Sequence, residues 1–298
     1  MLRKLIKNKT LLNKTVLITG TTSGIGLACV KHLAKLGCHI IACSRNNELA
    51  SSQLEALSKK YPNMKYNVYH LDLQNLDTIK NLVSNLKTDF PNGIDYVIHN
   101  AGIFARPKKQ TKFGIEQHFF TNCIAPIYLT EKLKNLLSQN SKVVYVSSIS
   151  AKYSKIDFEN IDLNNEKKNI KIYANTKAWL TNYVSYQKQA CTNLKFELQI
   201  IHPGVCASSL LSPKNNSLSK IVYGICQVGM RLLFHSPSKS ALCEIAGLTK
   251  TTGANEWIGP WCFGVWGKPK TTKLSSKNAN PEIQSKCYKT LNSIINKL

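Results

Sequence analysis

The sequence predicts an α/β fold in which helices cover both faces of a doubly wound parallel sheet of about seven strands. Short β-branched runs alternate with segments of helical spacing along most of the chain, an order typical of parallel sheets. A glycine-rich turn follows the first run, and no repeat or linker divides the chain. Its 298 residues can bury one large core. We expect a single domain over residues 14–267, with a basic leader over 1–13 and a basic tail over 268–298.

The chain is strongly basic. It has 40 Lys and Arg residues against 16 Asp and Glu, a net charge of +24. Such a surface attracts phosphates, anionic lipids or nucleic acids. The basic residues are spread along the chain, without an Arg-rich block or zinc-finger spacing, so we expect an anionic cofactor and no nucleic acid as a partner. Peripheral contact with a membrane through the leader stays open as a second interpretation.

Cysteine and histidine usage indicates a reduced protein without a metal. Ten Cys occur singly, with no C-x-x-C pair, and without a secretion signal this predicts free thiols in the cytoplasm. The seven His show no metal-ligand spacing, so no metal site is expected. No apolar run in the sequence approaches the ~20 residues of a membrane-spanning helix.

The first expected strand, residues 15–19, leads into a glycine-rich turn and then a helix over 27–36 that ends at Gly37. Strand, glycine turn and helix are the context of a Rossmann-type, dinucleotide-binding unit. Glycines let the backbone approach a pyrophosphate, and the free N–H groups of the helix N-terminus bind it. The expected contacts are Gly20, Thr22, Ser23, Gly24, Ile25 and Gly26.

The end of the second expected strand, 39–43, indicates which dinucleotide binds. An Asp or Glu there would hydrogen-bond the ribose 2′-hydroxyl of NAD(H). This chain has Ser44 and Arg45 instead, and an Arg can hold a 2′-phosphate with two hydrogen bonds. We therefore predict NADP(H), bound by both residues. NAD(H) stays open as the alternative, because Glu48 follows closely.

Further strands are expected at 66–71, 94–99, 142–148 and 195–201, and helices at 47–60, 76–86, 119–137 and from Ser236-Pro237 onward. Polar or small residues follow these strands: Asp72 and Leu73, then Asn100, Ala101 and Gly102, then Ser147 and Ser148, then Pro203, Gly204 and Val205. The carboxyl ends of parallel strands share one edge of a sheet, where open α/β sheets bind ligands. For Ser147 and Ser148 this position predicts a ligand site.

Tyr173 and Lys177 are the candidate catalytic pair. Residues four apart lie one above the other on a helix. A neighbouring ammonium favours the phenolate and lowers the Tyr pKa from its ordinary value of about 10. A Tyr tuned in this way acts as a general acid or base on an alcohol or carbonyl. Tyr153 has no Lys four residues on and is the weaker candidate.

In this order and on these elements, the motifs resemble those of the short-chain dehydrogenase/reductase family over about residues 13–265. The motifs are the glycine pattern from Thr19 to Gly26, Asn100-Ala101-Gly102, Ser147-Ser148, Tyr173 with Lys177, and Pro203-Gly204. The polar insert between Ser148 and Tyr173 is similar to that of the retinol-dehydrogenase-like branch. The resemblance implies an NAD(P)-dependent oxidoreductase that interconverts an apolar alcohol and its carbonyl.

The resemblance also implies roles for single residues. Tyr173 exchanges the proton, Lys177 holds the ribose hydroxyls, and Ser148 orients the reacting oxygen, with Ser147 as the fallback. Asn122 holds a water in a proton relay that runs to Lys177. The remaining implied cofactor contacts are Asp72 and Leu73 at the adenine, Asn100, Ala101 and Gly102 in the middle, and Pro203, Gly204 and Val205 over the nicotinamide.

The carboxyl third carries the remaining expectations. A substrate lid over about 205–236 contains the apolar segment 218–234, which implies an apolar substrate. Ser208 is the expected substitute for the Thr that relatives have after the Pro-Gly turn. An aromatic cluster is expected from Trp257, Trp261, Phe263 and Trp266, and a short helix from Pro281. Pairing as a homodimer is expected through the long helices. A catalytically silent dinucleotide sensor or scaffold and a peripheral membrane-binding protein stay open as alternatives.

Overall fold

The computed structural model describes residues 1–104, 106–161, 163, 166–191, 193–206 and 235–298. Most of the expected lid, including Ser208 and the apolar segment 218–234, lies outside the described residues. None of the helices in the described ranges is long and apolar enough to cross a membrane.

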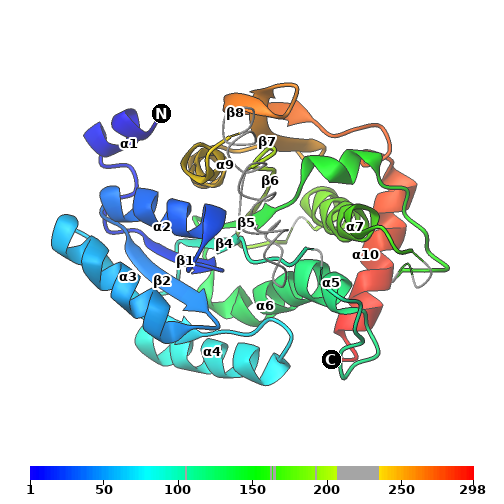
Figure 1. Cartoon of the computed structure of the whole chain (residues 1–298), viewed down its shortest axis with the longest axis horizontal. Coiled ribbons are helices and arrows are strands. Elements are labelled where there is room, and N and C mark those ends of the chain that lie inside the picture. The colour runs from blue at the N-terminus through cyan, green and yellow to red at the C-terminus, as the bar shows by residue number, and fades with distance from the viewer. Residues whose placement is uncertain (105, 162, 164–165, 192, 207–234) are drawn as a thin grey trace, which may run out of the picture.

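One eight-stranded sheet runs through the molecule in the order β3-β2-β1-β4-β5-β6-β7-β8 (Figure 1). Its strands are β1 (Thr15–Thr19), β2 (His39–Ser44), β3 (Lys65–His70), β4 (Tyr96–His99), β5 (Lys142–Val146), β6 (Glu197–Ile201), β7 (Glu256–Cys262) and β8 (Trp266–Lys273). Neighbours from β3 to β7 are parallel, and β8 is antiparallel to β7. The strand order reverses between β1 and β4, which confirms the predicted doubly wound α/β fold.

Helices cover both faces of this sheet. One face carries α2 (Gly24–Lys35), α3 (Asn47–Lys60) and α9 (Pro237–Thr249), and the other α4 (Leu76–Asp89), α6 (Ala125–Leu133), α7 (Asn169–Ala190) and α10 (Pro281–Ile295). Shorter helices are α1 (Leu2–Lys7), α5 (Gln117–Phe119), η1 (Phe120–Ile124), η2 (Lys134–Leu136) and η3 (Ile149–Tyr153). Along β1, Val16 and Ile18 join one core and Leu17 the other, as the alternation of side chains along a strand requires.

The helix expected over 119–137 is present over residues 117–136, but its hydrogen-bonding period changes along its length. The chain forms α5, then a π-helical turn, η1, then α6, then a 3₁₀ turn, η2. Residues 116–130 are all buried, so no polar stripe in the sequence marks where the helical period changes. Asn122 lies within η1, and π-helical turns often occur at functional sites.

The carboxyl third differs most from expectation. The predicted aromatic cluster is divided, because Trp257 is buried while Trp261, Phe263 and Trp266 are exposed on the hairpin of β7 and β8. Residues 266–273 form the eighth strand, β8, within a stretch that looks like a polar tail. An edge strand exposed to water carries Lys and Thr instead of apolar residues, so the sequence does not distinguish it from a loop.

Helix α10 packs along α7, as Figure 1 shows for the red and green helices. The rings of Tyr183 and Tyr288 are stacked 5.1 Å apart. Gln284 is fully buried, donates from Nε2 to the Ser185 hydroxyl at 3.1 Å and accepts from Gln189 at 2.9 Å. This face of α7 is therefore occupied by the chain's own last helix, and pairing of two copies through the long helices stays a prediction.

The α7–α10 packing predicts that α10 contributes to global stability. Leu291 on α10 is fully buried in the core, so Leu291→Ala should lower the free energy of unfolding by about 2–5 kcal/mol. Lys289→Ala, on the exposed side of the same helix, should change it by less than about 0.5 kcal/mol. Urea unfolding followed by circular dichroism measures both. Equal, small effects of the two substitutions would show that α10 is a loosely attached tail.

Candidate active site

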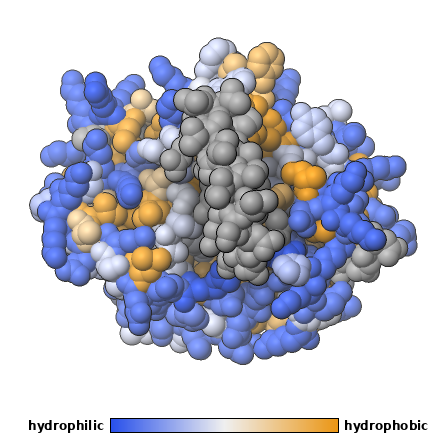
Figure 2. Space-filling model, in the orientation of Figure 1, coloured by the Kyte–Doolittle hydropathy of each residue, from blue (hydrophilic) through white to orange (hydrophobic). Residues whose placement is uncertain are grey.

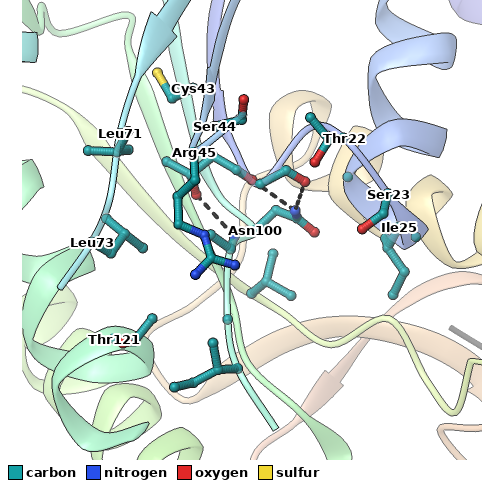
Figure 3. Close-up of a pocket in the computed structure, with 18 of the residues that line it drawn as sticks. Thr22, Ser23, Ile25, Cys43, Ser44, Arg45, Leu71, Leu73, Asn100 and Thr121 are labelled. Atoms are coloured by element: carbon teal, nitrogen blue, oxygen red, sulfur yellow. Dashed lines mark hydrogen bonds between the residues drawn. The ribbon is translucent and has the colours of Figure 1, made fainter. Parts of the chain in front are cut away.

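A crevice of about 300 Å³ opens at the carboxyl ends of β1, β2, β4 and β5. It lies at the point where the strand order reverses, where open α/β sheets bind their ligands. In Figure 3, Thr22, Ser23 and Ile25 lie on one side of it, Arg45, Leu71 and Leu73 on the other, and Asn100 between them. Tyr173 and Lys177 also line the crevice. The structure thus brings the two ends of the predicted site together.

The turn between β1 and α2 is so tight that its three glycine positions, 20, 24 and 26, do not favour a side chain. Gly20 has φ +75° and Gly24 φ +57°, values that L-residues with side chains rarely adopt. A Cβ at Gly26 would lie 2.0 Å from the Gly20 carbonyl oxygen. The turn leads directly into α2, whose first N–H groups have no partner within the helix. These groups and the local positive potential suit a pyrophosphate.

Asn100 ties the glycine turn to the end of β4. Its Nδ2 donates to the carbonyl oxygens of Thr19 at 2.8 Å and Gly20 at 3.1 Å. The hydroxyl of Thr19 in turn accepts from the backbone N–H of Ala101 at 3.0 Å. Gly102 follows, where a Cβ would lie 3.1 Å from Oδ1 of Asn122. The Asn-Ala-Gly motif therefore fixes two strand ends against each other and leaves room beside them.

Ser44 and Arg45 line the crevice after β2, together with Asp72 and Leu73 after β3. The Ser44 hydroxyl donates to the carbonyl oxygen of Asn46 at 2.9 Å, and the Asn46 side chain caps α3 by accepting from the Leu49 N–H at 2.9 Å. Arg45 is exposed, and Figure 3 shows its guanidinium extending along the crevice toward Leu73. Asp72 is held by the N–H of Gln74 at 3.0 Å.

Lys177 is buried at the end of the crevice opposite the glycine turn, and 3% of its surface is exposed. Its ammonium donates to the Val146 carbonyl oxygen at 2.7 Å and lies 5.7 Å from the centroid of the Tyr173 ring. Burial lowers the pKa of Lys177 to about 8, against a smaller opposing effect of Cys123. The ammonium is therefore charged at neutral pH and loses its proton in a mildly alkaline solution.

Tyr173 and Ser148 meet at the same end, and one prediction about them is wrong. Burial raises the pKa of Tyr173 to about 12, and a hydrogen bond with the Ser148 side chain lowers it only in part. The sequence predicts the opposite direction, with the ammonium of Lys177 as the cause. Desolvation of the phenol outweighs any effect of the ammonium in the chain alone, so Tyr173 is a neutral phenol at physiological pH.

The two consecutive serines after β5 point in different directions. The Ser147 hydroxyl lies against α7, 2.6 Å from the Thr181 hydroxyl and 3.4 Å from the Lys177 carbonyl oxygen. The Ser148 hydroxyl instead accepts from the Ser150 N–H at 3.2 Å, beside Tyr173. The Ser148 hydroxyl also accepts from the Ser150 hydroxyl at 2.9 Å, and Ser148 is not among the residues that line the crevice. Its role toward the reacting oxygen stays a prediction, whereas Ser147 has a structural position.

Asn122 does not line the crevice but lies behind it, fully buried. Its Oδ1 accepts from the Ile103 N–H at 2.8 Å, and its Nδ2 donates to the Ile103 carbonyl oxygen at 2.9 Å and to the Thr176 hydroxyl at 3.3 Å. These contacts join η1 to the loop after β4 and to α7. The water relay expected of Asn122 stays a prediction.

Pro203 lines the crevice, whereas Gly204 and Val205 lie beside it. Gly204 has φ +79°, and a Cβ at this position would lie only 2.8 Å from the Pro260 ring. The Val205 carbonyl accepts from the His235 N–H at 3.2 Å, and Cys206 pairs with His235 in a short parallel bridge. The two chain segments that flank residues 207–234 are thus joined next to the crevice.

Further lining residues were not predicted: Thr19, Cys43, Asn46, Leu71, Gln74, Ile103, Thr121 and Val146. Most of them directly precede or follow a motif residue, so the signal that could have revealed them is their position at a strand end. Thr121, in η1, likewise directly precedes the predicted site residue Asn122. The described residues contain no group of three or more His, Cys, Asp or Glu that could hold a metal ion.

A Rossmann-type crevice that runs from a glycine turn to a half-buried Tyr and a buried Lys is typical of an oxidoreductase that uses a nicotinamide dinucleotide. Residues 14–218 match the family model of short chain dehydrogenases. Because this match spans more than half of the sequence, the chain belongs to the short-chain dehydrogenase/reductase family. Members of this class act on alcohols and carbonyls with NAD(P), which confirms the predicted enzyme class.

Individual relatives agree with this assignment. The chain is 27% identical over 303 residues to a WW domain-containing oxidoreductase of Drosophila melanogaster, across 99% of this chain and 71% of that protein. It is 30% identical over 212 residues to retinol dehydrogenase 14 of Mus musculus, across 66% of this chain and 62% of that protein. A crystal structure of an uncharacterized protein from Mycobacterium paratuberculosis superimposes with a TM-score of 0.70 at 23% identity, covering 96% of this chain and 94% of that one.

The lowered pKa of Lys177 predicts that dinucleotide binding weakens in alkaline solution. We expect the charged ammonium to favour the bound dinucleotide, so the dissociation constant should rise as the pH passes upward through the free-enzyme pKa of about 8. Fluorescence titration with NADH and with NADPH at increasing pH measures this. In Lys177→Arg the side chain stays charged, so the inflection near this pH should disappear. An inflection that persists in this variant would assign it to another group.

Proposed function

We propose that this protein is an NADP(H)-dependent oxidoreductase that interconverts an apolar alcohol and its carbonyl, with Tyr173 as the acid or base. The observation that carries the proposal is the convergence of three groups at one end of the crevice. The Tyr173 phenol is hydrogen-bonded to the Ser148 side chain, and the Lys177 ammonium lies 5.7 Å from the Tyr173 ring. A substrate oxygen between Tyr173 and Ser148 would have two hydrogen-bonding partners.

The described residues fit a dinucleotide. Gly20 and Gly26 leave a backbone cradle that a Cβ would fill, and α2 offers its N-terminus to the pyrophosphate. Asp72 and Leu73 are available to the adenine, and Lys177 to the ribose beside the nicotinamide. The bound cofactor supplies the hydride, and the protein supplies binding, orientation and proton transfer.

Arg45 supports the preference for NADP(H). It lines the crevice after β2, at the position where an acid would bind the 2′-hydroxyl of NAD(H). A guanidinium there matches the geometry and charge of a 2′-phosphate. Asp72 is the only acid among the described lining residues, and it follows β3, not β2.

The protonation states favour reduction of a carbonyl. A neutral phenol can donate its proton to the carbonyl oxygen as negative charge develops there. The raised pKa of Tyr173, to about 12, keeps this proton in place at neutral pH, and the Ser148 hydroxyl orients the accepting oxygen. Oxidation of an alcohol would need the phenolate, which becomes more abundant as pH rises.

Phe104 supports an apolar substrate. Its ring packs edge-on against Tyr173, with the centroids 5.3 Å apart, so the catalytic phenol has an apolar neighbour on the loop after β4. The retinol dehydrogenase among the relatives is named for an apolar alcohol. We further propose a cytoplasmic location, because the nine cysteines of the described ranges are all free and mostly buried.

Two other functions were expected as alternatives. A catalytically silent dinucleotide sensor needs no proton donor, whereas Ser148, Tyr173 and Lys177 are all present and adjacent. A purely membrane-binding role would leave the glycine cradle without a purpose.

Tyr173→Phe tests the proposed acid directly. Carbonyl reduction, followed as the loss of NADPH absorbance over a panel of apolar ketones and aldehydes, should slow roughly 10²–10⁴-fold. NADPH affinity should change little, because the aromatic ring remains. The matched control is Tyr153→Phe, at a side chain that is 78% exposed, which should leave turnover unaltered. Unchanged turnover of the Tyr173 variant would remove this residue from the chemistry.

Arg45→Asp tests the cofactor preference. The ratio of NADPH to NADH affinity should fall by about tenfold or more, because a bidentate contact is lost and a like charge faces the 2′-phosphate. Arg3→Asp makes the same change of charge on α1 and serves as the control for the overall field of the protein. Equal ratios in the two variants would contradict the assigned role of Arg45.

A further inference from the structure

The turn between β7 and β8 carries a bulky apolar residue in an unfavourable conformation. Val265 N–H donates to the Cys262 carbonyl oxygen at 2.9 Å, and both central residues have positive φ, Phe263 at 49° and Gly264 at 69°. This is the pattern of a type I′ turn, which matches the strand twist and strongly favours Asn-Gly or Asp-Gly. A Phe in the left-handed region is a steric outlier.

Phe263 is also the most exposed large apolar side chain of the described residues, at 86%. The hairpin therefore carries two unfavourable features at one position, a strained backbone and an apolar ring in water. Asn at 263 would remove both while keeping the turn. Strained backbone and unfavourable residue choices of this kind occur at functional sites. Here they indicate that the Phe263 ring takes part in binding.

Two further aromatic side chains lie at the same end of the hairpin. Trp261 is 61% and Trp266 43% exposed, and Cys262 pairs with Trp266 across the two strands. The indole of Trp261 lies over Gly267, where a Cβ would meet its Nε1 at 2.0 Å, so the exposed indole is held in place by the fold. Apolar and pale side chains gather at the top edge of Figure 2, where Figure 1 shows this hairpin.

The surroundings of the three rings are basic. Exposed side chains occur at every second position of β8: Trp266, Lys268 and Lys270. The three therefore lie on one face of this edge strand. The sequence has no acidic residue between Glu256 and Glu282. Aromatic rings flanked by Lys are the composition that membrane interfaces favour, and each Lys is attracted to anionic headgroups.

We propose that the β7–β8 hairpin binds the surface of an anionic lipid bilayer, with Phe263, Trp261 and Trp266 in the interface and Lys268 and Lys270 at the headgroups. The chain carries a net charge of +24, which suits an anionic surface and disfavours a second copy of the same basic protein. The Phe263 ring is exposed at the hairpin tip and does not lie in a groove, which suits a soft interface. This binding does not depend on the proposed reaction.

Phe263→Asn is the decisive variant, because it separates folding from binding. Partitioning of the full-length protein onto vesicles of phosphatidylcholine and phosphatidylserine in equal parts, measured by sedimentation, should fall roughly tenfold. The melting temperature should stay the same or rise, because Asn-Gly suits a type I′ turn. The control is Leu49→Asn on α3, at the opposite edge of the sheet, where Leu49 is 43% exposed; it should partition like the original protein.

A second variant and two outcomes complete the test. Trp266→Thr, a residue suited to an edge strand, should also weaken partitioning, and vesicles of phosphatidylcholine alone should bind the original protein less. Equal partitioning of Phe263→Asn and Leu49→Asn would overturn the proposal. Self-association of the original protein without lipid, abolished by Phe263→Asn in size-exclusion chromatography, would also overturn it by assigning the hairpin to a protein interface.

Discussion

The active-site end of the crevice depends on how a buried ammonium is held. Burial disfavours the charge of Lys177, and the bond from its Nζ to the Val146 carbonyl at 2.7 Å offsets part of that cost. Ser147, the next residue, binds the same turn of α7 through the Thr181 hydroxyl at 2.6 Å. One turn of α7 is thereby fixed against the end of β5. Tyr173 stands one turn earlier on the helix, and this places its phenol beside Ser148.

Those parts of the site that depend on neighbouring residues could be predicted from the sequence. The glycine turn between β1 and α2 and the Tyr173–Lys177 spacing each lie within one or two elements. The direction of the Tyr173 pKa could not be predicted, because it depends on burial by segments distant in the chain. The choice between Ser147 and Ser148 depends on where β5 ends, and β5 ends at Val146, two residues before the predicted end at 148.

The secondary structure likewise has parts that the sequence predicts and parts that it does not. Buried strands and amphipathic helices with clear caps have the expected ranges, as in α3, where Asn46 accepts from Leu49 N–H. The sequence is less informative where burial is complete or absent. In η1 every residue is buried, so no stripe reveals the π-helical turn, and β8 is exposed enough to look like a loop. The exposure of Trp261 and Phe263 was missed because aromatic residues are ordinarily buried.

The hairpin and the crevice are mechanically one unit, and His202 is the reason. Its backbone N–H donates to the Ile258 carbonyl at 2.8 Å, and its ring lies 4.3 Å from that of Trp257. The ring fits because position 259 is a glycine, where a Cβ would lie 1.9 Å from its Nε2, and it also lies against Gly264, where a Cβ would be 3.2 Å from its Cε1. His202 directly precedes Pro203, which lines the crevice. Close packing transmits displacement instead of absorbing it, so we expect a shift of the turn that carries Phe263 to move His202 and, with it, Pro203 at the crevice.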